Sequence, residues 1–387
     1  MNYFLNKNLV FKDDVILVRV GINVPINKKG IIEDDFRLQA ILPTLKFLIQ
    51  KKAKIILIGH IGRDPKLSLK KVFKYFKEKE KLPFFFDEKT FLNFNKNKVK
   101  KIKQKIINLK KGEILLLDNI RASELEKENS NDFAKLLSQL AGVYINEAFS
   151  VSHREHASIV GLPKFFKKKY FGLQFEKEIN FFKKIKNLKK GDNNILILGG
   201  AKIKTKLPLI DKLSDKFDKI IIGGVIANNF YKFLGYEIGQ SVYEKEELNL
   251  LKYIKLDSLY IPKIVIVKNR DGITEEKEIN IVKQNDTILD ISPQSFLDLK
   301  NDFRKAKTIF LNGPLGHYES GFKDGTEFLL KNLIRKNSLF IVGGGNTASL
   351  VSKIDLKKKV DFISTGGGSL IKYISDGNLI GIKKFEK

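Results

Sequence analysis

Short, continuous runs of apolar residues recur along the chain at fairly regular intervals. Each run is rich in β-branched residues and is followed by Gly, Asn, Asp or His. Strands of parallel sheets have this pattern because helices cover both faces of the sheet. The predicted strands are Val15–Val20, Ile55–Ile58, Ile114–Leu117, Val143–Ile145, Ile195–Leu198, Ile220–Ile222, Ile264–Val267, Thr308–Leu311 and Leu339–Val342.

Longer segments with helical spacing of apolar residues lie between most of these runs. The clearest are Leu38–Gln50, Asp132–Leu140, Thr205–Lys216 and Thr326–Lys336. The Lys-rich stretch Lys66–Lys111 also has helical apolar spacing, and we interpret it as ordinary surface elements. Buried strands that alternate with amphipathic helices predict an α/β protein with parallel sheets. Nine or more strands would make a large open sheet, so we expect two doubly wound, Rossmann-like domains.

One long segment is suited to join two such domains. Residues Leu173–Leu188 have the pattern of a single helix and follow the loop Gly161–Pro163. We therefore expect an N-terminal domain over residues 1–172, a connector helix over 173–189, and a C-terminal domain over 190–371.

Composition excludes several protein classes and leaves one question open. The chain of 387 residues has no Cys, which excludes disulfides and thiolate metal sites. No apolar run approaches the roughly 18 residues of a membrane span, and Met1–Phe11 is too short and mixed for a signal peptide, so we expect a cytoplasmic protein. The formal charge is +28, which suits nonspecific binding of nucleic acid. Specific nucleic-acid binding is not expected, because no known nucleic-acid-binding motif accompanies the charge, and the abundance of Lys, Asn, Ile and Phe fits an AT-rich coding sequence.

Cationic residues follow the predicted strands of the first half. Arg63, Arg121 and Arg154 each lie just past a separate strand, and Arg37 and His60 lie near them in the predicted fold. Ligands of doubly wound sheets bind at the carboxyl ends of strands, and guanidinium groups pair well with carboxylate and phosphate oxygens. This half therefore predicts a site for a small, multiply charged anion.

Glycines follow the predicted strands of the second half. Backbone amides at such positions can approach phosphates. Lys202 and Lys206 are four residues apart beside Gly199–Gly200, and at helical spacing both could reach a phosphate chain. The sequence contains neither a P-loop motif nor a dinucleotide-binding G-x-G-x-x-G after the first strand, which disfavours a nicotinamide-dependent dehydrogenase. A nucleotide site here and an anion site in the first half indicate transfer between them.

Eleven collinear segments identify a family resemblance over essentially the whole chain. They are Leu17–Pro25, Asp34–Pro43, Gly59–Arg63, Leu116–Arg121, Asn146–Ser158, Gly199–Leu207, Gly223–Phe230, Lys307–Glu319, Gly325–Thr326, Gly343–Thr347 and Ser364–Gly368. In order and spacing they resemble phosphoglycerate kinase. The resemblance implies a bilobed, hinged and monomeric enzyme of glycolysis that transfers a phosphoryl group from 1,3-bisphosphoglycerate to ADP, giving 3-phosphoglycerate and ATP. It also implies that the tail, about residues 372–387, packs on the N-terminal domain.

The resemblance also implies roles for individual residues. Phosphoglycerate would be bound by Asn23, Arg37, His60, Ile61, Gly62, Arg63, Arg121 and Arg154. ADP or ATP with Mg²⁺ would be bound by Gly200, Ala201, Lys206, Asn312, Glu319, Gly344, Gly345, Asn346 and Thr347. Arg37, Lys202, Gly366 and Gly367 would surround the phosphoryl group in transfer.

Two departures from the family pattern bear on activity, and further substitutions accompany them. Gly21 replaces an Asp that contacts the hydroxyl end of the substrate, and the lost hydrogen bond should cost roughly 1–3 kcal/mol. Asn346 replaces an Asp at the metal and gives up its charge, so we expect weaker handling of the Mg-nucleotide. Ser150 replaces a Gly. These departures leave two hypotheses: an active enzyme with reduced efficiency, and a degraded relative that binds nucleic acid or anions.

Overall fold

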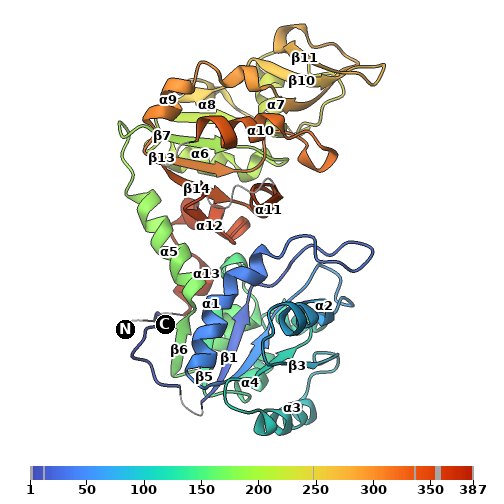
Figure 1. The fold of residues 1–387 in the computed structure, drawn as a ribbon, viewed down its shortest axis with the longest axis vertical. Coiled ribbons are helices and arrows are strands. Elements are labelled where there is room, and N and C mark those ends of the chain that lie inside the picture. Colours follow the sequence, from blue (N-terminus) through green and yellow to red (C-terminus); the bar gives the residue numbers. More distant parts are fainter. Residues whose placement is uncertain (1–2, 12–13, 247, 335–336, 354–358, 386–387) are drawn as a thin grey trace. The chain divides into compact units, whose positions relative to one another are not determined.

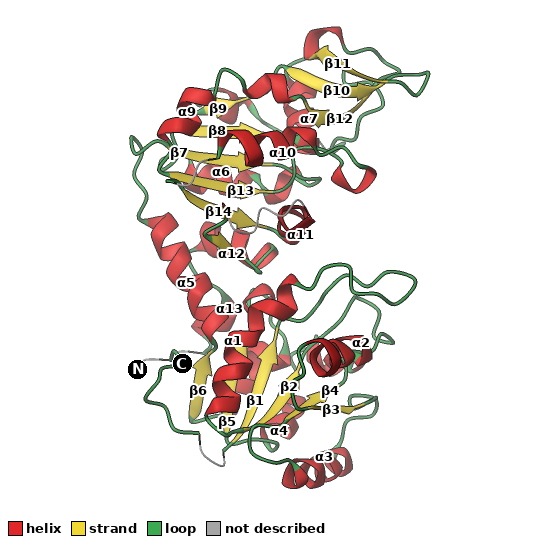
Figure 2. Ribbon diagram, viewed as in Figure 1, coloured by secondary structure: helices red, strands yellow, loops and turns green. Residues whose placement is uncertain are grey.

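The computed structural model describes residues 3–11, 14–246, 248–334, 337–353 and 359–385. The chain divides into two compact units, which we name unit 1 (residues 1–181 and 376–387) and unit 2 (residues 182–375). Each unit contains a six-stranded parallel sheet with helices packed around it (Figures 1 and 2). The prediction of two parallel-sheet α/β domains is confirmed.

The sheet of unit 1 has the strand order β3-β4-β2-β1-β5-β6, and all neighbouring strands are parallel. The central strand β1 reads VILVRV and is buried from its second residue onward, as expected of a strand covered on both faces. The strands are β1 (Val15–Val20), β2 (Lys54–Ile58), β3 (Phe84–Asp87), β4 (Ile114–Leu117), β5 (Val143–Glu147) and β6 (Lys168–Phe171).

Two helices of unit 1, α3 and α4, begin at side-chain caps. Asn95 accepts hydrogen bonds from the amides of Asn97 and Lys98 at the start of α3, and Ser130 accepts one from Phe133 at the start of α4. The α-helices are α1 (Phe36–Gln50), α2 (Lys70–Lys74), α3 (Lys96–Asn108), α4 (Asn131–Ser138) and, near the C-terminus, α13 (Ile380–Lys383).

Helix α5 (Leu173–Lys186) begins at a buried carboxylate. Glu147, the last residue of β5, accepts hydrogen bonds from the amides of Gln174 (3.0 Å) and Phe175 (3.1 Å) and from the Thr44 hydroxyl (2.5 Å). These bonds satisfy amides that have no partner inside the helix. Burial nevertheless raises the pKa of Glu147 to about 7. The division between the two units falls within α5, after Phe181.

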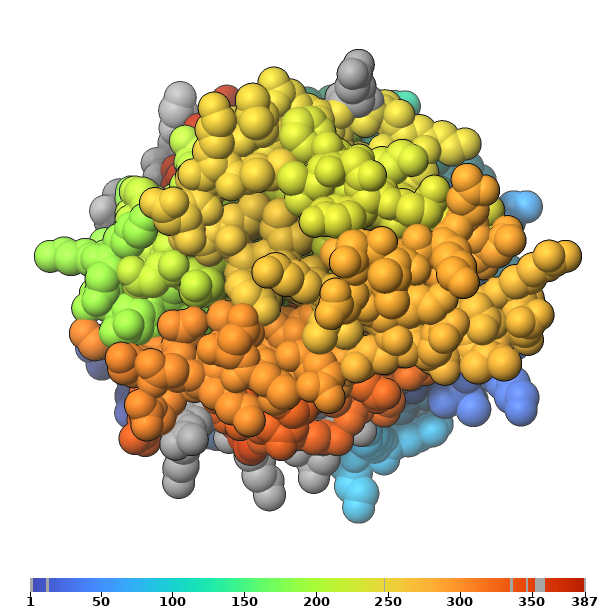
Figure 3. Space-filling view, turned by 90° about the horizontal axis from the view of Figure 1, so that it is seen from above, coloured from blue at the N-terminus to red at the C-terminus, as the bar shows by residue number. Residues whose placement is uncertain are grey.

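Unit 2 contains a parallel sheet with the order β15-β14-β13-β7-β8-β9 and a separate antiparallel sheet with the order β11-β10-β12. The antiparallel sheet, coloured yellow to orange, contributes to the face of unit 2 in Figure 3. The strands are β7 (Asn194–Leu198), β8 (Lys219–Ile222), β9 (Leu259–Tyr260), β10 (Ile264–Lys268), β11 (Thr274–Glu278), β12 (Thr287–Ile291), β13 (Thr308–Asn312), β14 (Leu339–Gly343) and β15 (Phe362–Ile363). The helices are α6 (Leu207–Leu213), α7 (Gly224–Phe233), α8 (Leu251–Ile254), α9 (Lys300–Lys305), α10 (Asp324–Phe328), α11 (Gly345–Lys353) and α12 (Gly368–Asp376).

Three local predictions were wrong or incomplete. The run Ile264–Val267 forms β10, but its neighbours β11 and β12 are antiparallel, and only alternate residues of β10 are buried. An apolar run alone does not reveal strand direction. The stretch Lys66–Lys111 contains the strand β3 as well as helices, and the basic segment Lys168–Phe171 forms the edge strand β6. Both are edge strands, which are partly solvated, and β6 (KKYF) lacks the apolar run that marks the central strands.

Candidate functional site

The predicted cationic residues of unit 1 lie at the carboxyl ends of neighbouring parallel strands. His60 follows β2, Arg121 lies in the 3-10 turn η2 (Ile120–Ala122) after β4, and Arg154 follows the turn η4 (Phe149–Val151) after β5. His60 and Arg121 are buried, whereas Arg63 and Arg154 are exposed. We name Arg19, Arg37, His60, Arg63, Arg121 and Arg154 the arginine cluster.

Backbone contacts hold the loop after β2 in place. The Gly62 amide donates to Asn23 Oδ1 (2.7 Å), and Arg121 Nη1 donates to the Gly62 carbonyl (2.6 Å). Gly62 has a φ of 63°, in the left-handed region that favours glycine. Arg37 Nη1 donates to the Asn23 carbonyl (2.7 Å). The structure thus brings together Asn23, Arg37, Gly62 and Arg121, which lie far apart in the sequence.

Electrostatics show that the arginine cluster carries excess positive charge. The pKa of His60 lies well below its usual value because of burial and of the charges of Arg19, Arg121, Arg154 and Arg37. Burial, followed by Arg154 and Arg19, lowers the pKa of Arg121 to about 10. His60 is therefore neutral near pH 7 while the arginines stay charged. A bound anion would relieve this repulsion.

Sequence reasoning missed Arg19, the most buried member of the arginine cluster, and the buried residues that support it. Arg19, in β1, is 1% exposed; its Nε donates to Ser158 Oγ (2.9 Å), and its Nη2 lies 3.2 Å from His60 Nδ1. Ser158 donates from its amide (2.8 Å) and its hydroxyl (2.6 Å) to the buried carboxylate of Glu126. Burial lowers the pKa of Arg19 and raises that of Glu126. The available signal was Arg19 itself, a charged residue inside an apolar strand.

Asn119, between β4 and Arg121, was also missed as a positioning residue. Its side chain donates to the carbonyls of Ile61 (3.1 Å) and Leu67 (2.8 Å), and its oxygen accepts from the Ile61 amide (3.4 Å). These bonds fix the loop that carries His60 and Arg63.

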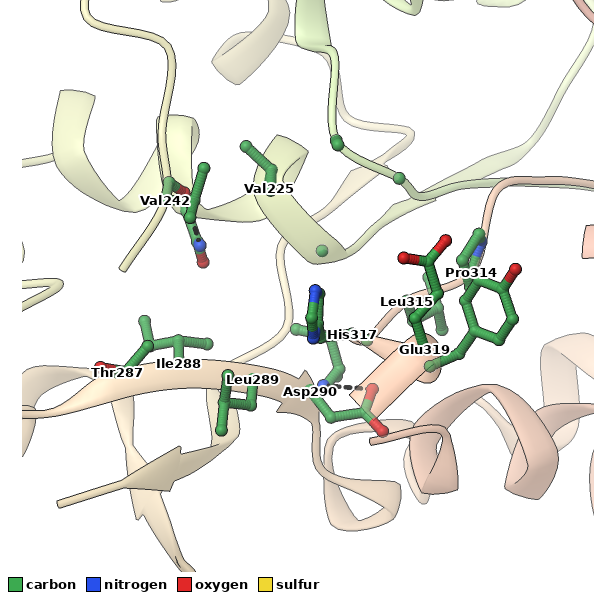
Figure 4. Close-up of a pocket in the computed structure, with 17 residues that line it drawn as sticks. Val225, Val242, Thr287, Ile288, Leu289, Asp290, Pro314, Leu315, His317 and Glu319 are labelled. Carbon is green, nitrogen blue, oxygen red and sulfur yellow. Dashed lines mark hydrogen bonds between the residues drawn. The ribbon is translucent and has the colours of Figure 1, made fainter. Parts of the chain in front are cut away.

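Unit 2 contains a pocket with a volume of about 330 Å³ beside its parallel sheet. Of the predicted nucleotide-binding residues, Gly200, Ala201 and Glu319 line it. In the view of Figure 4, Val225 and Val242 lie on one side of the pocket and Ile288 and Leu289 on the other. Sequence reasoning did not single out the lining residues Asn228, Val242, Thr287, Ile288, Leu289, Asp290, Ile291 and His317. They come from several separated elements, and no spacing in the sequence connects them.

The glycines after β7 and β13 allow the backbones of two loops to approach each other. A Cβ on Gly199 would collide with the carbonyls of Gly313 and Pro314. The Gly200 amide donates to the Pro314 carbonyl (2.8 Å), and the Gly224 amide donates to that of Leu315 (2.7 Å). The amides of Gly200 and Gly224 are thus used in loop packing.

Lys206 is a buried cation next to the loop after β14. Its Nζ donates to the Asn312 carbonyl (3.2 Å) and to the Asn312 side-chain oxygen. Among the described residues it has no acidic partner, and burial lowers its pKa to about 8. Thr347, in α11, accepts a hydrogen bond from the Gly313 amide (2.9 Å), and the side-chain oxygen of Asn312 lies near Gly344. Lys206, Asn312, Gly344 and Thr347 therefore form one cluster.

Lys202 and Lys206 do not lie on one helix, as their spacing had suggested. Residues Ile203–Thr205 form the 3-10 turn η7, and α6 begins only at Leu207, with Pro208 in its first turn. Proline favours the start of a helix, since its missing N–H is not needed there. As a result Lys202 is exposed and Lys206 is buried.

The two remaining predicted glycine loops precede helices. Gly344 and Gly345 lead into α11, and Gly366 and Gly367 lead into α12, so each pair lies where helix amides have no intrahelical partner. β14 and β15, the strands before these loops, pair directly, which brings the two loops to the same edge of the sheet. The side chain of Asn346 lies outside the described residues.

The described residues contain no group of three or more His, Asp or Glu side chains that could hold a metal ion. In nucleotide sites the oxygen ligands of Mg²⁺ come largely from the phosphates and water. Within the described part of the chain, no helix has the length and apolarity that crossing a membrane requires.

Comparisons with known proteins agree over nearly the whole chain. A family model described as phosphoglycerate kinase matches residues 6–377. The phosphoglycerate kinase of Pseudothermotoga lettingae is 33% identical over 394 residues, covering 97% of both chains. That of Geobacter metallireducens is 36% identical over 388 residues, covering 97% of this chain and 96% of the relative.

Solved structures give the same result. Phosphoglycerate kinase from Coxiella burnetii matches with a TM-score of 0.77 and 28% identity, covering 99% of this chain and 98% of that one. The enzyme from Pyrococcus horikoshii has the same fold, with a TM-score of 0.83 at 24% identity and the same coverage.

Proposed function

Because this chain belongs to the phosphoglycerate kinase family, we propose that it catalyses reversible phosphoryl transfer from 1,3-bisphosphoglycerate to ADP, giving 3-phosphoglycerate and ATP. The observation that carries the proposal is that one chain contains both an arginine cluster, in unit 1, and a pocket with a buried lysine, in unit 2. The family assignment also supports a glycolytic, monomeric and cytoplasmic enzyme.

Phosphoglycerate is the proposed ligand of the arginine cluster. It carries a phosphate and a carboxylate, and arginines bind such groups through paired hydrogen bonds. Arg37, Arg63, Arg121 and Arg154 would supply the charge. Neutral His60 would supply a hydrogen bond, and Asn23 with the backbone of Ile61 and Gly62 would shape the site.

The Mg-nucleotide is the proposed ligand of unit 2. The apolar pocket suits a base and its ribose, and Glu319, which lines it, would accept hydrogen bonds from the ribose hydroxyls. Lys206 would bind the phosphate chain, because a buried ammonium without an acidic partner favours an anionic ligand. Asn312 and the loop Gly344–Thr347 would lie along the same phosphates, and Gly200 and Ala201 would border the pocket. Mg²⁺ would arrive with the nucleotide and neutralise phosphate charge.

The chemistry fits this inventory of groups. The acceptor carboxylate of 3-phosphoglycerate is already ionised near neutral pH, so the reverse transfer needs no general base. Phosphoryl transfer then depends on in-line positioning and on groups that stabilise charge on the phosphoryl oxygens. Lys202, Arg37 and the amides near Gly366 and Gly367 are the proposed groups.

A nucleic-acid-binding role is the weaker candidate. It rests on the +28 charge alone, whereas Arg37, Lys202, Lys206 and Glu319, the residues proposed for transfer, are all present. Binding of this kind would weaken steeply with salt, because phosphate contacts release counterions.

Steady-state kinetics of ATP formation from 1,3-bisphosphoglycerate and Mg-ADP test the proposal. We expect turnover of about 1–10³ per second that Lys202→Ala abolishes. Lys204→Ala is the matched control, since Lys204 is exposed and pairs with Glu246. Folded protein with no turnover above that of the Lys202→Ala variant would overturn the proposed activity.

A further inference from the structure

Gly21 and Ser150 are neighbours beyond the carboxyl ends of the adjacent strands β1 and β5. Gly21 is buried and directly follows β1, and Ser150 lies in η4, which follows the adjacent strand β5. A Cβ on Gly21 would lie 3.0 Å from the Ser150 hydroxyl oxygen and 3.7 Å from Ala148 Cα. The Ser150 hydroxyl therefore occupies the space next to any side chain at position 21.

The backbone does not explain the glycine at position 21. Gly21 is not among the residues with positive φ, so the chain conformation there is open to other residues. What limits a side chain at position 21 is therefore space, and the Ser150 side chain occupies that space. Of these two neighbouring positions, only residue 150 contributes a side chain.

Gly21 and Ser150 are each close in sequence to residues of the arginine cluster or of the loop that it holds. Gly21 lies between Arg19, which contacts His60, and Asn23, which accepts from the Gly62 amide. The Arg154 amide donates to the Val151 carbonyl (3.0 Å), directly after Ser150. Among the described residues, the half-buried Ser150 hydroxyl makes no hydrogen bond.

We propose that the Ser150 hydroxyl binds the carbon-2 hydroxyl of phosphoglycerate, in the place of a side chain at position 21. This inference rests on the proposed function. The arginines match the anionic ends of the ligand, which leaves its neutral hydroxyl to a group that both donates and accepts. The carbon-2 hydroxyl would then have a hydrogen-bond partner even though residue 21 is a glycine.

Calorimetric titration with two ligands tests this contact. One is 3-phosphoglycerate, and the other is its 2-deoxy analogue, 3-phosphooxypropanoate. We expect the unmodified chain to bind 3-phosphoglycerate about tenfold more tightly, since a buried polar group is left unpaired in the analogue complex. Ser150→Ala should reduce this preference to about threefold or less. Ser138→Ala, on the exposed end of α4, is the matched control and should keep the preference.

A second variant separates contact from packing. Gly21→Ala should crowd the Ser150 hydroxyl and weaken 3-phosphoglycerate binding. In a Ser150→Ala background the same change should weaken this binding little further, because the effects of substitutions at contacting residues are not additive. A Ser150→Ala protein that keeps the full preference for 3-phosphoglycerate would overturn the inference. Failure of the unmodified chain to bind 3-phosphoglycerate at all would instead overturn the proposed function.

Discussion

The two units carry candidate ligand sites of different kinds on the same type of sheet. In unit 1 the side chains carry the site: charged groups from β1, α1 and the loops after three other strands converge, supported by buried partners such as Glu126. In unit 2 the walls are mainly apolar and glycine loops pack backbone to backbone, with Lys206 as a buried charge. A small anion offers little surface besides its charge, whereas a nucleotide offers an apolar base as well.

This contrast predicts that single substitutions will affect one ligand at a time. The largest effect is expected for Arg121→Ala, which removes a 7%-exposed guanidinium that also holds the Gly62 loop. Losing a buried charged partner costs about 2–4 kcal/mol, or roughly 30- to 1000-fold in KM for 3-phosphoglycerate. The KM for Mg-ATP in the same assay should stay within about twofold. Arg304→Ala, an exposed arginine of unit 2 bonded to Asn301, should change neither KM.

Lys206→Met should weaken nucleotide binding and stabilise the free protein. In the folded chain the pKa of Lys206 is about 8, below the value of about 10.4 in an unfolded chain. The buried ammonium therefore costs stability below pH 8, and the cost is relieved as pH rises from about 8 to about 10.4. At pH 7 we expect the variant to gain about 1–3 kcal/mol in free energy of unfolding, allowing for lost bonds to Asn312, while KM for Mg-ADP rises tenfold or more.

Denaturant titrations at pH 7 and pH 10 check the stability part. The difference between Lys206→Met and the unmodified chain should shrink at the higher pH. An unchanged difference would show that Lys206 is not a desolvated cation in the free protein. Lys204→Met serves as the control for removing a lysine from the same segment.

His60→Gln should change how stability depends on pH. Burial and the surrounding arginines hold the pKa of His60 well below its usual value, so the unfolded chain takes up this proton first as pH falls. The contribution of neutral His60 to the free energy of unfolding is thus fully present above about pH 6.5. Below that pH it decreases by up to about 1.4 kcal/mol per pH unit. Unfolding free energies measured from pH 5 to pH 8 should fall less steeply in acid for the variant. Equal slopes would contradict this assignment.

The smallest effect is expected for Asn228→Ala in the wall of the unit 2 pocket. Asn228 Nδ2 donates to the Val242 carbonyl (2.9 Å), which holds that segment against α7. Losing one such bond costs about 1 kcal/mol, so KM for Mg-ADP should rise about fivefold, with KM for 3-phosphoglycerate unchanged. An equal change in both KM values would show that the pocket wall is not specific to the nucleotide.

The sequence predicts the central strands well, and it predicts the supporting residues poorly. β1 and β4 have the predicted bounds because buried parallel strands read as unbroken apolar runs. β6 was missed because its sequence, KKYF, lacks such a run, and β3 was missed because it lies within a Lys-rich stretch whose apolar spacing is helical. The anion-binding candidates His60 and Arg121 could be found from their positions after strands. Glu126 could not be, because only the fold brings it to Ser158 and Arg19.

The helical spacing of Lys202 and Lys206 was misleading for a local reason. Pro208 favours the start of α6 at Leu207, which leaves Lys202 outside the helix and Lys206 at the N-cap position. The lining of the unit 2 pocket could not be predicted for a different reason, which is that its residues include parts of α7, β12 and the segment after β13. Such a set follows from tertiary packing and not from any local pattern.

The most direct test of the two-site account is a set of calorimetric titrations with 3-phosphoglycerate and with Mg-ADP. The proteins are the unmodified chain, Arg121→Ala and Lys206→Met. We predict that the unmodified chain binds both ligands, that Arg121→Ala loses 3-phosphoglycerate but keeps Mg-ADP, and that Lys206→Met shows the reverse. A folded variant that loses both ligands equally, or neither, would contradict the claim that each unit recognises its own ligand.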